Sequence, residues 1–340
     1  MRIGKNPAKE HTTSTAQSYH RVVVPVYIPN LEEAYFKEGL LILRYCLESL
    51  LKTVHHKTRI SIFNNASCEE VSDYLKELFA THTAIDQLVH SKTNIGKINA
   101  IHACVRGQSE ALITITDADV LFLNNWQQGV EKVFHDFPQA GMVSPVPVSN
   151  IYKHKAASST FGYGFSKGMV SFENVPDPDA LVKFQESVGA NLFEGSRLKK
   201  FLCLKNKNGA AVLSCGHFVA TLRSEVFQHA PKASAKDLIS KKTDFEYIDK
   251  PNNELGYLRL ATLQNYAYHL GNASEPWMHD IFSKISTNTT PPFFAEKPSE
   301  AIIKSSLMVQ CYKLLHTFIL QKAPIRKLYF RWKGMKDPTY

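Results

Sequence analysis

The sequence lacks any apolar run of the roughly 18–20 residues that a membrane-spanning helix needs. It also lacks a Cys-x-x-Cys pair, internal repeats and low-complexity segments, although 44% of its 340 residues are hydrophobic. The sequence therefore does not predict a membrane-spanning helix, a metal or redox site built on a CxxC motif, or a repeat architecture. The apolar content argues against general disorder. Met1 to His20 is polar and has no apolar core, so we expect residues 1–20 to be a disordered arm and not a secretory signal.

The six cysteines fall mostly inside apolar segments, which predicts buried thiols in a reducing, cytoplasmic compartment. The net charge is +9, which is compatible with nucleic acid, an anionic membrane or phosphorylated substrates as partners. No nucleic-acid-binding motif occurs, so we expect no nucleic-acid partner.

The most informative segment, the apolar run of residues 111–123, predicts a buried β-strand that ends in two carboxylates two residues apart, Asp117 and Asp119. The run is typical of a central parallel strand. In open α/β sheets ligands bind at the carboxyl ends of strands, and carboxylates are suitable ligands for Mg²⁺ and Mn²⁺. A divalent ion held there would neutralise a pyrophosphate. The alternative is that one carboxylate caps the next helix and the other is solvated.

Strands and helices alternate through about residue 145, which predicts a doubly wound, mostly parallel α/β sheet. The second helix, residues 68–80, is expected to start at Ser67 as its N-cap. From Pro145 onward, prolines and glycines indicate a loop-rich functional stretch or lid. A strand region at 210–222 and an acidic cluster at 244–249 follow.

Five motifs then occur in a familiar order: Val22-Val-Val-Pro-Val-Tyr27, Asn64-Asn-Ala-Ser67, Asn94-Ile-Gly-Lys97, Asp117-Ala-Asp119, and Ser214-Cys-Gly216 with Leu222-Arg-Ser-Glu225. Over residues 20–272 the chain resembles nucleotide-sugar glycosyltransferases of the GT-A fold, similar to family 2. The resemblance implies a Rossmann-like sheet with a smaller acceptor-side region and a C-terminal helical extension. It implies an inverting, hexosyltransferase-type enzyme (EC 2.4) with a Mn²⁺ or Mg²⁺ cofactor. A UDP-sugar is the favoured donor, a glycan or lipid-linked molecule is the acceptor, and surface polysaccharide synthesis is the role.

The resemblance also implies residue roles. Donor binding is expected from Pro25, Tyr27, Asn64, Asn65, Asn94, Gly96, Lys97, Asp117, Ala118 and Asp119, and metal binding from Asp117, Asp119 and His269. Asp244 is the expected base, with Glu246 and Asp249 as alternatives, and Gly216 and His217 lie on the acceptor side. The sequence departs from the family at Asn64, where an aspartate is usual, and at Thr243, which replaces an acid. Asp244 as a helix cap and His269 as a core histidine remain alternatives.

The resemblance divides the chain into residues 1–20 as an arm, 21–145 as the nucleotide-sugar half, 146–275 as the acceptor and catalytic-base half, and 276–340 as a helical, basic extension. Residues 301–321 have helical apolar spacing that includes Ile302 and Ile303, and residues 324–334 mix aromatics with cations. Two interpretations stay open for this extension. It binds the anionic inner face of a membrane as a peripheral anchor, or it packs on the catalytic domain with a basic tail.

Three rival functions fit parts of this pattern. A haloacid-dehalogenase-like phosphatase also places Asp-x-Asp after an apolar strand, but its usual late Gly-Asp dipeptide is absent. A sugar-nucleotide pyrophosphorylase would have a Gly-rich basic loop after the first strand, and residues 27–30 are not one. A catalytically inactive nucleotide-sugar-binding protein remains open because of Thr243.

Overall fold

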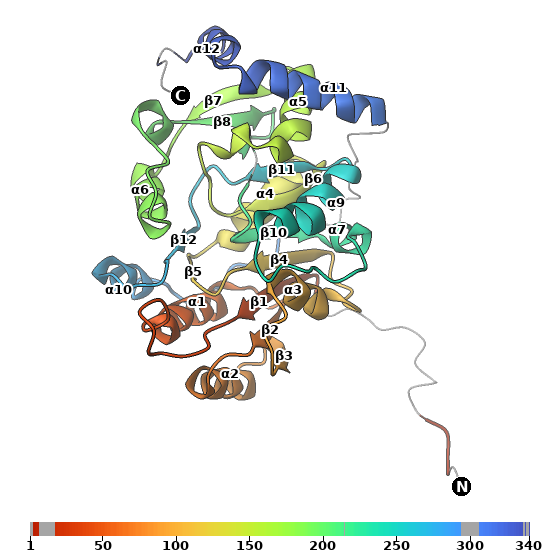
Figure 1. Ribbon diagram of the computed structural model, residues 1–340, viewed down its shortest axis with the longest axis vertical. Helices are drawn as coiled ribbons and strands as arrows, with labels where there is room; N and C mark the ends of the chain where they lie inside the picture. The colour runs from red at the N-terminus through yellow and green to blue at the C-terminus, as the bar shows by residue number, and fades with distance from the viewer. Residues whose placement is uncertain (1–2, 7–17, 214, 294–305, 336, 338–339) are drawn as a thin grey trace.

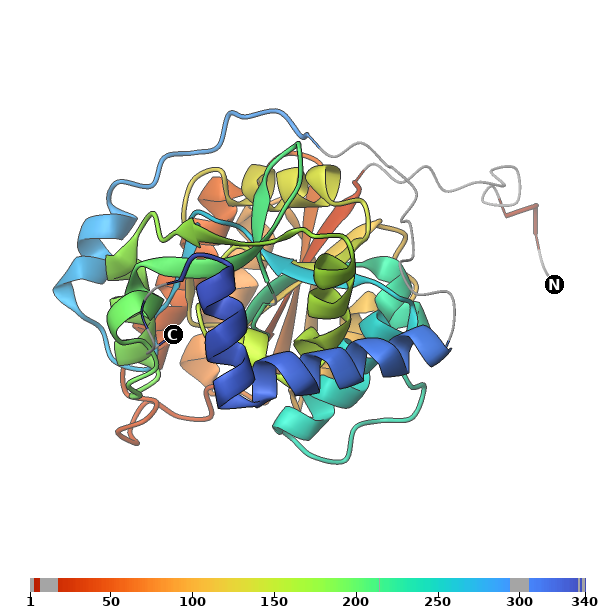
Figure 2. The same ribbon diagram turned by 90° about the horizontal axis from the view of Figure 1, so that it is seen from above.

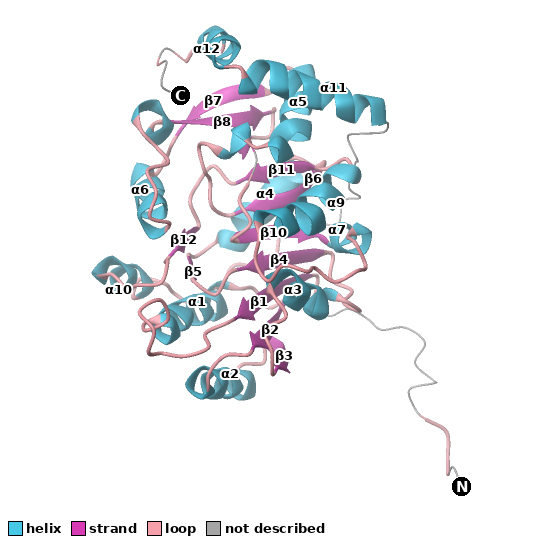
Figure 3. Ribbon diagram, in the orientation of Figure 1, coloured by secondary structure: helices cyan, strands magenta, loops and turns pink. Residues whose placement is uncertain are grey.

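The computed structural model describes residues 3–6, 18–213, 215–293, 306–335, 337 and 340. Most of the predicted arm, Ser214 of the acceptor-side motif, and Ile302 and Ile303 lie outside the described residues. The structure is built on a ten-stranded sheet in the order β3-β2-β1-β4-β10-β6-β11-β9-β8-β7, with a separate two-stranded sheet of β5 and β12 (Figure 1, Figure 3).

The strands are β1 His20–Val26, β2 Thr58–Asn65, β3 Ile85–Ser91, β4 Leu112–Thr116, β5 Val120–Phe122, β6 Ala140–Ser144, β7 Val170–Asn174, β8 Lys200–Lys205, β9 Ala210–Leu213, β10 Val219–Arg223, β11 Leu258–Ala261 and β12 Ala267–His269. The α-helices are α1 Gly39–Thr53, α2 Glu69–Thr81, α3 Lys97–Val105, α4 Trp126–Asp136, α5 Ser158–Ser166, α6 Pro178–Ser187, α7 Ser224–His229, α8 Lys241–Asp244, α9 Lys250–Glu254, α10 Pro276–Phe282, α11 Ser306–His316 and α12 Ala323–Trp332. Two π-helical turns, η5 Phe245–Asp249 and η6 Thr317–Gln321, follow α8 and α11, and 3₁₀ turns lie at η2 Ile151–Lys153, η3 Lys155–Ala157 and η4 Gly195–Leu198.

The predicted fold class, a mixed and mostly parallel α/β sheet, is confirmed. Strands β3, β2, β1 and β4 are parallel neighbours, and β6 and β11 are parallel to each other. β10 runs antiparallel between β4 and β6, and β9, β8 and β7 extend the sheet with antiparallel pairs. Every residue of β4 is buried, as expected of a central strand with both faces covered. The sheet is continuous through both predicted halves of the chain.

The buried strand that ends at the two carboxylates is confirmed, because β4 ends at Thr116, directly before Asp117. The sequence did not predict that the chain then leaves the main sheet through Asp117–Asp119 to form β5. Two other local predictions were wrong. Ser67 is not a helix cap, because its hydroxyl instead accepts a hydrogen bond from the Ile28 amide at 3.1 Å, while Cys68 occupies the N-cap position. The segment after Pro145 contains α5, β7 and α6, and is held by tertiary packing that the prolines and glycines did not reveal.

The C-terminal helices α11 and α12 lie together at one end of the molecule, beyond β7 and β8 (Figure 1). Tyr312, Ile319, Leu320, Tyr329 and Phe330 are buried, so the inner side of this layer packs on the protein. Within the described residues, no helix combines the length and apolar character that crossing a bilayer requires.

Candidate active site

A cavity of about 380 Å³ opens at the carboxyl ends of β1, β2 and β4. This is the edge where ligands bind in open α/β sheets. Most of the predicted donor-binding residues line it: Pro25, Tyr27, Asn65, Asn94, Lys97, Asp117, Ala118 and Asp119. We call it the donor cavity. The structure therefore brings together, from four separate segments, the residues that the sequence motifs selected.

Two asparagines fix the loop between β3 and α3 at the rim of the donor cavity. The side-chain Nδ2 of Asn65 donates to Asn94 Oδ1 at 2.8 Å, and Asn65 Oδ1 accepts from the backbone amide of Ile95 at 2.9 Å. Gly96 has φ +86°, and a Cβ there would meet the backbone of Leu238 at 2.8 Å. Only glycine combines this backbone conformation with such a close approach. These contacts therefore fix the backbone of the loop and place Lys97 in the first turn of α3.

Asp119 and His269 come together through the small second sheet. In this antiparallel pair His269 lies opposite Val120, and the Leu270 amide donates to the Asp119 carbonyl at 2.8 Å. His269 Nε2 then lies 3.5 Å from Asp119 Oδ2. Residues 150 positions apart in the chain are therefore neighbours, although only Asp119 lines the donor cavity and His269 does not.

The hydrogen bonds around His269 define which ring nitrogen carries the proton in the neutral form. The Ser187 hydroxyl donates to the Phe184 carbonyl at 2.8 Å, so its oxygen must accept from His269 Nδ1, 2.9 Å away. The neutral ring consequently directs the Nε2 lone pair at the Asp119 carboxylate. Asp119 Oδ1 is buried and has no hydrogen-bond partner. A lone pair facing a carboxylate, with a buried unpartnered oxygen beside it, is a donor set that fits a divalent cation.

The charges of the donor cavity are coupled. Burial raises the pKa of Asp119, while His269 and Lys97 oppose that rise. Burial alone would lower the pKa of Lys97, but its ion pair with Asp117 outweighs this effect and raises it. Lys97 therefore stays protonated and can pass from Asp117 to a bound phosphate, which is also an anion.

Two predicted donor residues do not line this cavity. Asn64 is buried; its amide donates to Ser72 Oγ at 2.8 Å and its Oδ1 accepts from the Ser67 amide at 3.0 Å. Gly96 acts through the backbone contact described above. Contact of Asn64 with a nucleobase stays a prediction.

A second cavity of about 510 Å³ contains Asp244 together with the two predicted acceptor-side residues, Gly216 and His217. We call it the acceptor cavity. Burial raises the pKa of Asp244, and the charges of Lys97 and His217 oppose the rise. Lys97 and Asp117, which line the donor cavity, both act electrostatically on Asp244. A carboxylate with a raised pKa beside a donor site has the properties of a general base.

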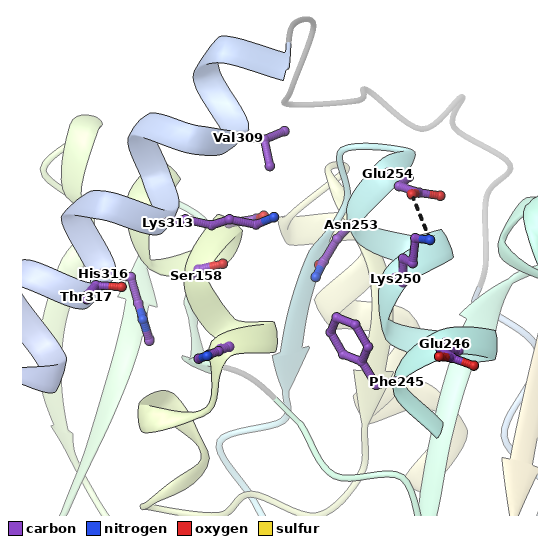
Figure 4. A pocket seen from close by; sticks show the side chains of 12 residues that line it. Ser158, Phe245, Glu246, Lys250, Asn253, Glu254, Val309, Lys313, His316 and Thr317 are labelled. Carbon is purple, nitrogen blue, oxygen red and sulfur yellow. Dashed lines mark ion pairs between the residues drawn. The ribbon is translucent and has the colours of Figure 1, made fainter. Parts of the chain in front are cut away.

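The structure separates the three candidate bases. Asp249 is fully buried and is held by Arg259 at 2.9 Å and by His217 at 2.6 Å. Glu246 lines a different cavity of about 650 Å³ between α11 and the η5–α9 segment (Figure 4). Phe245 and Lys313 extend into this larger cavity from opposite sides. It lacks the Asp-x-Asp carboxylates, so its size does not make it the reaction site. Asp244 alone of the three combines partial exposure with proximity to the donor cavity.

The acceptor cavity is lined by basic side chains, namely Lys153, His154, Lys241 and Arg259, together with the carboxylates of Asp244 and Asp249. Burial lowers the pKa of His154, and burial followed by the charges of Arg197 and Arg326 lowers the pKa of Lys153 to about 8. The Arg259 guanidinium is 1% exposed, and its Nε and Nη1 atoms have no partner among the described residues. The mixed charges of the lining therefore favour a polar acceptor over an apolar one.

Sequence reasoning missed part of the donor cavity wall. Tyr35 and Phe36 follow β1, Gly271 and Asn272 follow β12, and Ile239 comes from the loop before α8. Hydrogen bonds connect that loop to α3. The backbone amide of Lys97 donates to the Leu238 carbonyl at 3.0 Å, and the side chain of Asn99 both donates to the Ala235 carbonyl and accepts from the Ala235 amide. The Gly271-Asn272 pair directly after His269 was the only available signal.

One further cluster has metal-ligand side chains, and it lies at the opposite edge of the sheet. His20, His55 and Glu131 are buried, with ligand atoms within 4.8 Å of one another; within the described part of the chain they are the one group of three with this spacing, and Asp117, Asp119 and His269 do not form another. His20 Nδ1 accepts from Gln127 at 2.9 Å, its Nε2 bonds Thr114 Oγ1 at 2.6 Å, and His55 Nε2 bonds Glu131 at 3.0 Å. Because these atoms are already satisfied within the protein, the cluster is a structural network.

The fold and this site define a class: an α/β protein with a cation-compatible carboxylate site at the carboxyl edge of its parallel strands. No protein-family model matches the chain, and no curated protein matches its sequence. Among solved structures it is similar to the mannosyltransferase PcManGT from Pyrobaculum calidifontis in complex with GDP-Man and Mn²⁺ (15% identity, 72% of this chain and 54% of that chain, TM-score 0.40). It is also similar to residues 1–349 of S. aureus TarS (12%, 73% and 59%, 0.41) and to GalNAc-T7 with UDP, GalNAc and Mn²⁺ (12%, 74% and 44%, 0.47).

The matched region spans about half of each of these chains. Similarity at this level does not transfer an activity, so the function has to be argued from the residues of the two cavities.

Proposed function

We propose that this protein is a metal-dependent, inverting glycosyltransferase of the GT-A type, similar to family 2. The observation that supports it is the donor cavity itself. Two carboxylates and a lysine line it, and the imidazole of His269, which is not part of the lining, lies 3.5 Å from one of the carboxylates. A nucleoside diphosphate-sugar needs a cation and a basic side chain at its diphosphate, and the motif order resembles that family.

In this proposal Asp119 and His269 hold a Mn²⁺ or Mg²⁺ ion, and Asp117 either shares the ion or binds the ribose. When bound, such an ion neutralises the charge that develops on the leaving diphosphate. Lys97 exchanges its ion pair with Asp117 for a phosphate oxygen. The aromatic side chains of Tyr27, Tyr35 and Phe36 form the apolar wall beside the nucleoside.

Asp244 serves as the base that removes the proton from the acceptor hydroxyl. It belongs to the acceptor cavity and not to the donor cavity, which suits a single displacement with inversion of the anomeric carbon. Gly216 and His217 contribute the acceptor side, and Asp249 with Arg259 orients His217. A glycan or lipid-linked acceptor, a UDP-sugar donor, hexosyl transfer and a role in surface polysaccharide synthesis are carried over from the family resemblance alone.

The test combines binding with turnover. A thermal-shift panel of UDP, GDP, dTDP and CMP, each with and without Mn²⁺, should identify one nucleotide whose stabilisation needs the metal. Hydrolysis of the corresponding nucleotide-sugar, or its transfer to an acceptor, should then fall about 10²- to 10⁴-fold in Asp244→Asn with nucleotide binding unchanged.

Glu246→Gln is the matched control, because Glu246 lies two residues from Asp244 along the chain but lines the cavity between α11 and the η5–α9 segment. Equal losses in both variants would contradict the assignment of the base. Metal-dependent nucleotide binding without any turnover would support an inactive nucleotide-sugar-binding protein instead.

A further inference from the structure

An exposed apolar face runs along α11 and α12. Its members are Leu307, Cys311, Leu314, Phe318, Leu328 and Trp332, which we call the outer face. The first four follow the spacing i, i+4, i+7, i+11 and so lie on one side of the helix. Leu307, Leu314, Leu328 and Trp332 are 69%, 70%, 69% and 73% exposed, and Phe318 is 55% exposed.

The outer face is not an unfinished core contact, because the same helices are anchored by their opposite side. Tyr312 packs against Gly162 of α5 so closely that a Cβ there would lie 2.4 Å from the tyrosine ring. His316 Nε2 bonds the Tyr152 carbonyl at 2.9 Å, and Tyr329 and Phe330 are buried in the main core. Figure 2, which looks onto this end of the molecule, shows α11 and α12 meeting at an angle in front of the other elements. The apolar side chains are therefore presented on a firmly held layer.

This layer also carries charge of one sign. Residues 306–335 contain no Asp or Glu and six cations, which are Lys313, Lys322, Arg326, Lys327, Arg331 and Lys333. Within the described part of the chain none of the six forms an ion pair with a carboxylate. Lys322 lies over the Phe318 ring at 5.6 Å and Lys333 over the Trp332 ring at 4.8 Å. Lys322 and Lys333 thus share the outer face with apolar rings, whereas Lys313 extends into the cavity of Figure 4 and Arg326 donates to the Leu320 carbonyl.

We propose that the outer face docks on the surface of an anionic lipid bilayer. Leucines and a tryptophan would enter the boundary between headgroups and acyl chains while the flanking lysines and arginines contact anionic headgroups. A second copy of this chain is disfavoured because two such faces would bring cations of like charge against one another. A nucleic acid would satisfy the cations but leave the leucines in water. Of these three partners, the bilayer matches both features.

The test uses the full chain and vesicles, without donor or acceptor, so its outcome is independent of the proposed enzyme activity. Co-sedimentation should show binding to phosphatidylcholine vesicles that contain phosphatidylglycerol, and much weaker binding to pure phosphatidylcholine. Replacing Lys327, Arg331 and Lys333 by Gln should weaken binding about 100-fold, at roughly fivefold per cation. Leu314→Ser with Leu328→Ser should also weaken it at least tenfold, since two apolar side chains no longer enter the bilayer.

Tryptophan fluorescence gives a second readout. Trp332 is highly exposed, Trp126 is fully buried, and the half-buried Trp277 lies on α10, away from α11 and α12 (Figure 1), so a blue shift on adding anionic vesicles should disappear in Trp332→Phe. The matched control is Phe79→Ser with Lys92→Gln, two exposed positions at the other end of the molecule near α2 (Figure 1). Melting temperatures would show that every variant is folded.

Four results would overturn the proposal. The first is equal binding to anionic and neutral vesicles, and the second is an equal loss of vesicle binding in the control and the outer-face variants. The third is self-association that Leu314→Ser abolishes, with no binding to vesicles. The fourth is salt-sensitive binding to duplex DNA that is stronger than vesicle binding and is unchanged by the leucine substitutions.

Discussion

Replacing Asp119 by Asn should abolish metal-dependent nucleotide binding without lowering the stability of the ligand-free protein. The substitution keeps the side-chain volume and removes one negative charge from the donor cavity. Asp119 Oδ1 is buried without a hydrogen-bond partner, and burial raises the pKa of this carboxyl. The ionised group thus disfavours the ligand-free fold, so the melting temperature of Asp119→Asn without ligands should not fall below that of the unmodified protein.

The loss on the binding side can be estimated. A nucleotide present at 100 times its dissociation constant stabilises the native state by about 2.7 kcal/mol. The unfolding entropy of about 2.1 cal/mol/K per residue gives roughly 0.7 kcal/mol/K for 340 residues. The metal-dependent nucleotide should therefore raise the melting temperature by about 4 °C. In Asp119→Asn, which leaves His269 without its carboxylate partner, this increment should shrink to below about 1 °C.

The assay is a thermal shift with Mn²⁺ alone, nucleotide alone and both together, run on the unmodified protein, on Asp119→Asn and on Asp280→Asn. Asp280 is an exposed aspartate of α10 and serves as the charge-matched control. A full metal-dependent increment in Asp119→Asn would refute the assignment of the cation site, and loss of the increment in both variants would show that net charge alone is responsible.

Three further outcomes follow from the same structure. Lys97→Met should weaken nucleoside diphosphate binding about tenfold or more, measured by calorimetry, because a charge-assisted hydrogen bond contributes about 1.5–3 kcal/mol; unchanged affinity would contradict its phosphate role. Gly96→Ala should destabilise the fold by about 1–3 kcal/mol in urea unfolding, since φ is +86° and Leu238 blocks a Cβ; Gly107→Ala, also at positive φ but in open space, should cost less. Burial would raise the pKa of Glu131, but the interactions with His20 and His55 outweigh it and lower the pKa from 4.5 to about 2. The stabilisation of up to about 3 kcal/mol is therefore present above pH 4.5 and is lost as the pH falls toward 2. Acid unfolding of Glu131→Gln should consequently be flatter through that window, and an unchanged profile would refute the coupling.

The sequence alone was sufficient for the parallel half of the fold and for most of the donor cavity. Alternation of apolar strands with amphipathic helices is local information. Polar residues that follow successive parallel strands must meet at one edge, so their positions along the chain are enough to group Asn65, Lys97 and Asp117 in one site.

Long-range packing decided the rest. Nothing near position 117 shows that the chain leaves the main sheet there, because β5 exists only by pairing with β12 some 150 residues later, and this pairing is also what places His269 beside Asp119. The choice among Asp244, Glu246 and Asp249 likewise depends on which side of a π-helical segment faces which cavity, and on Arg259 from β11. Local periodicity indicates that a residue lies on a helix or strand, but its neighbours across the fold determine whether it is buried, paired or free to react.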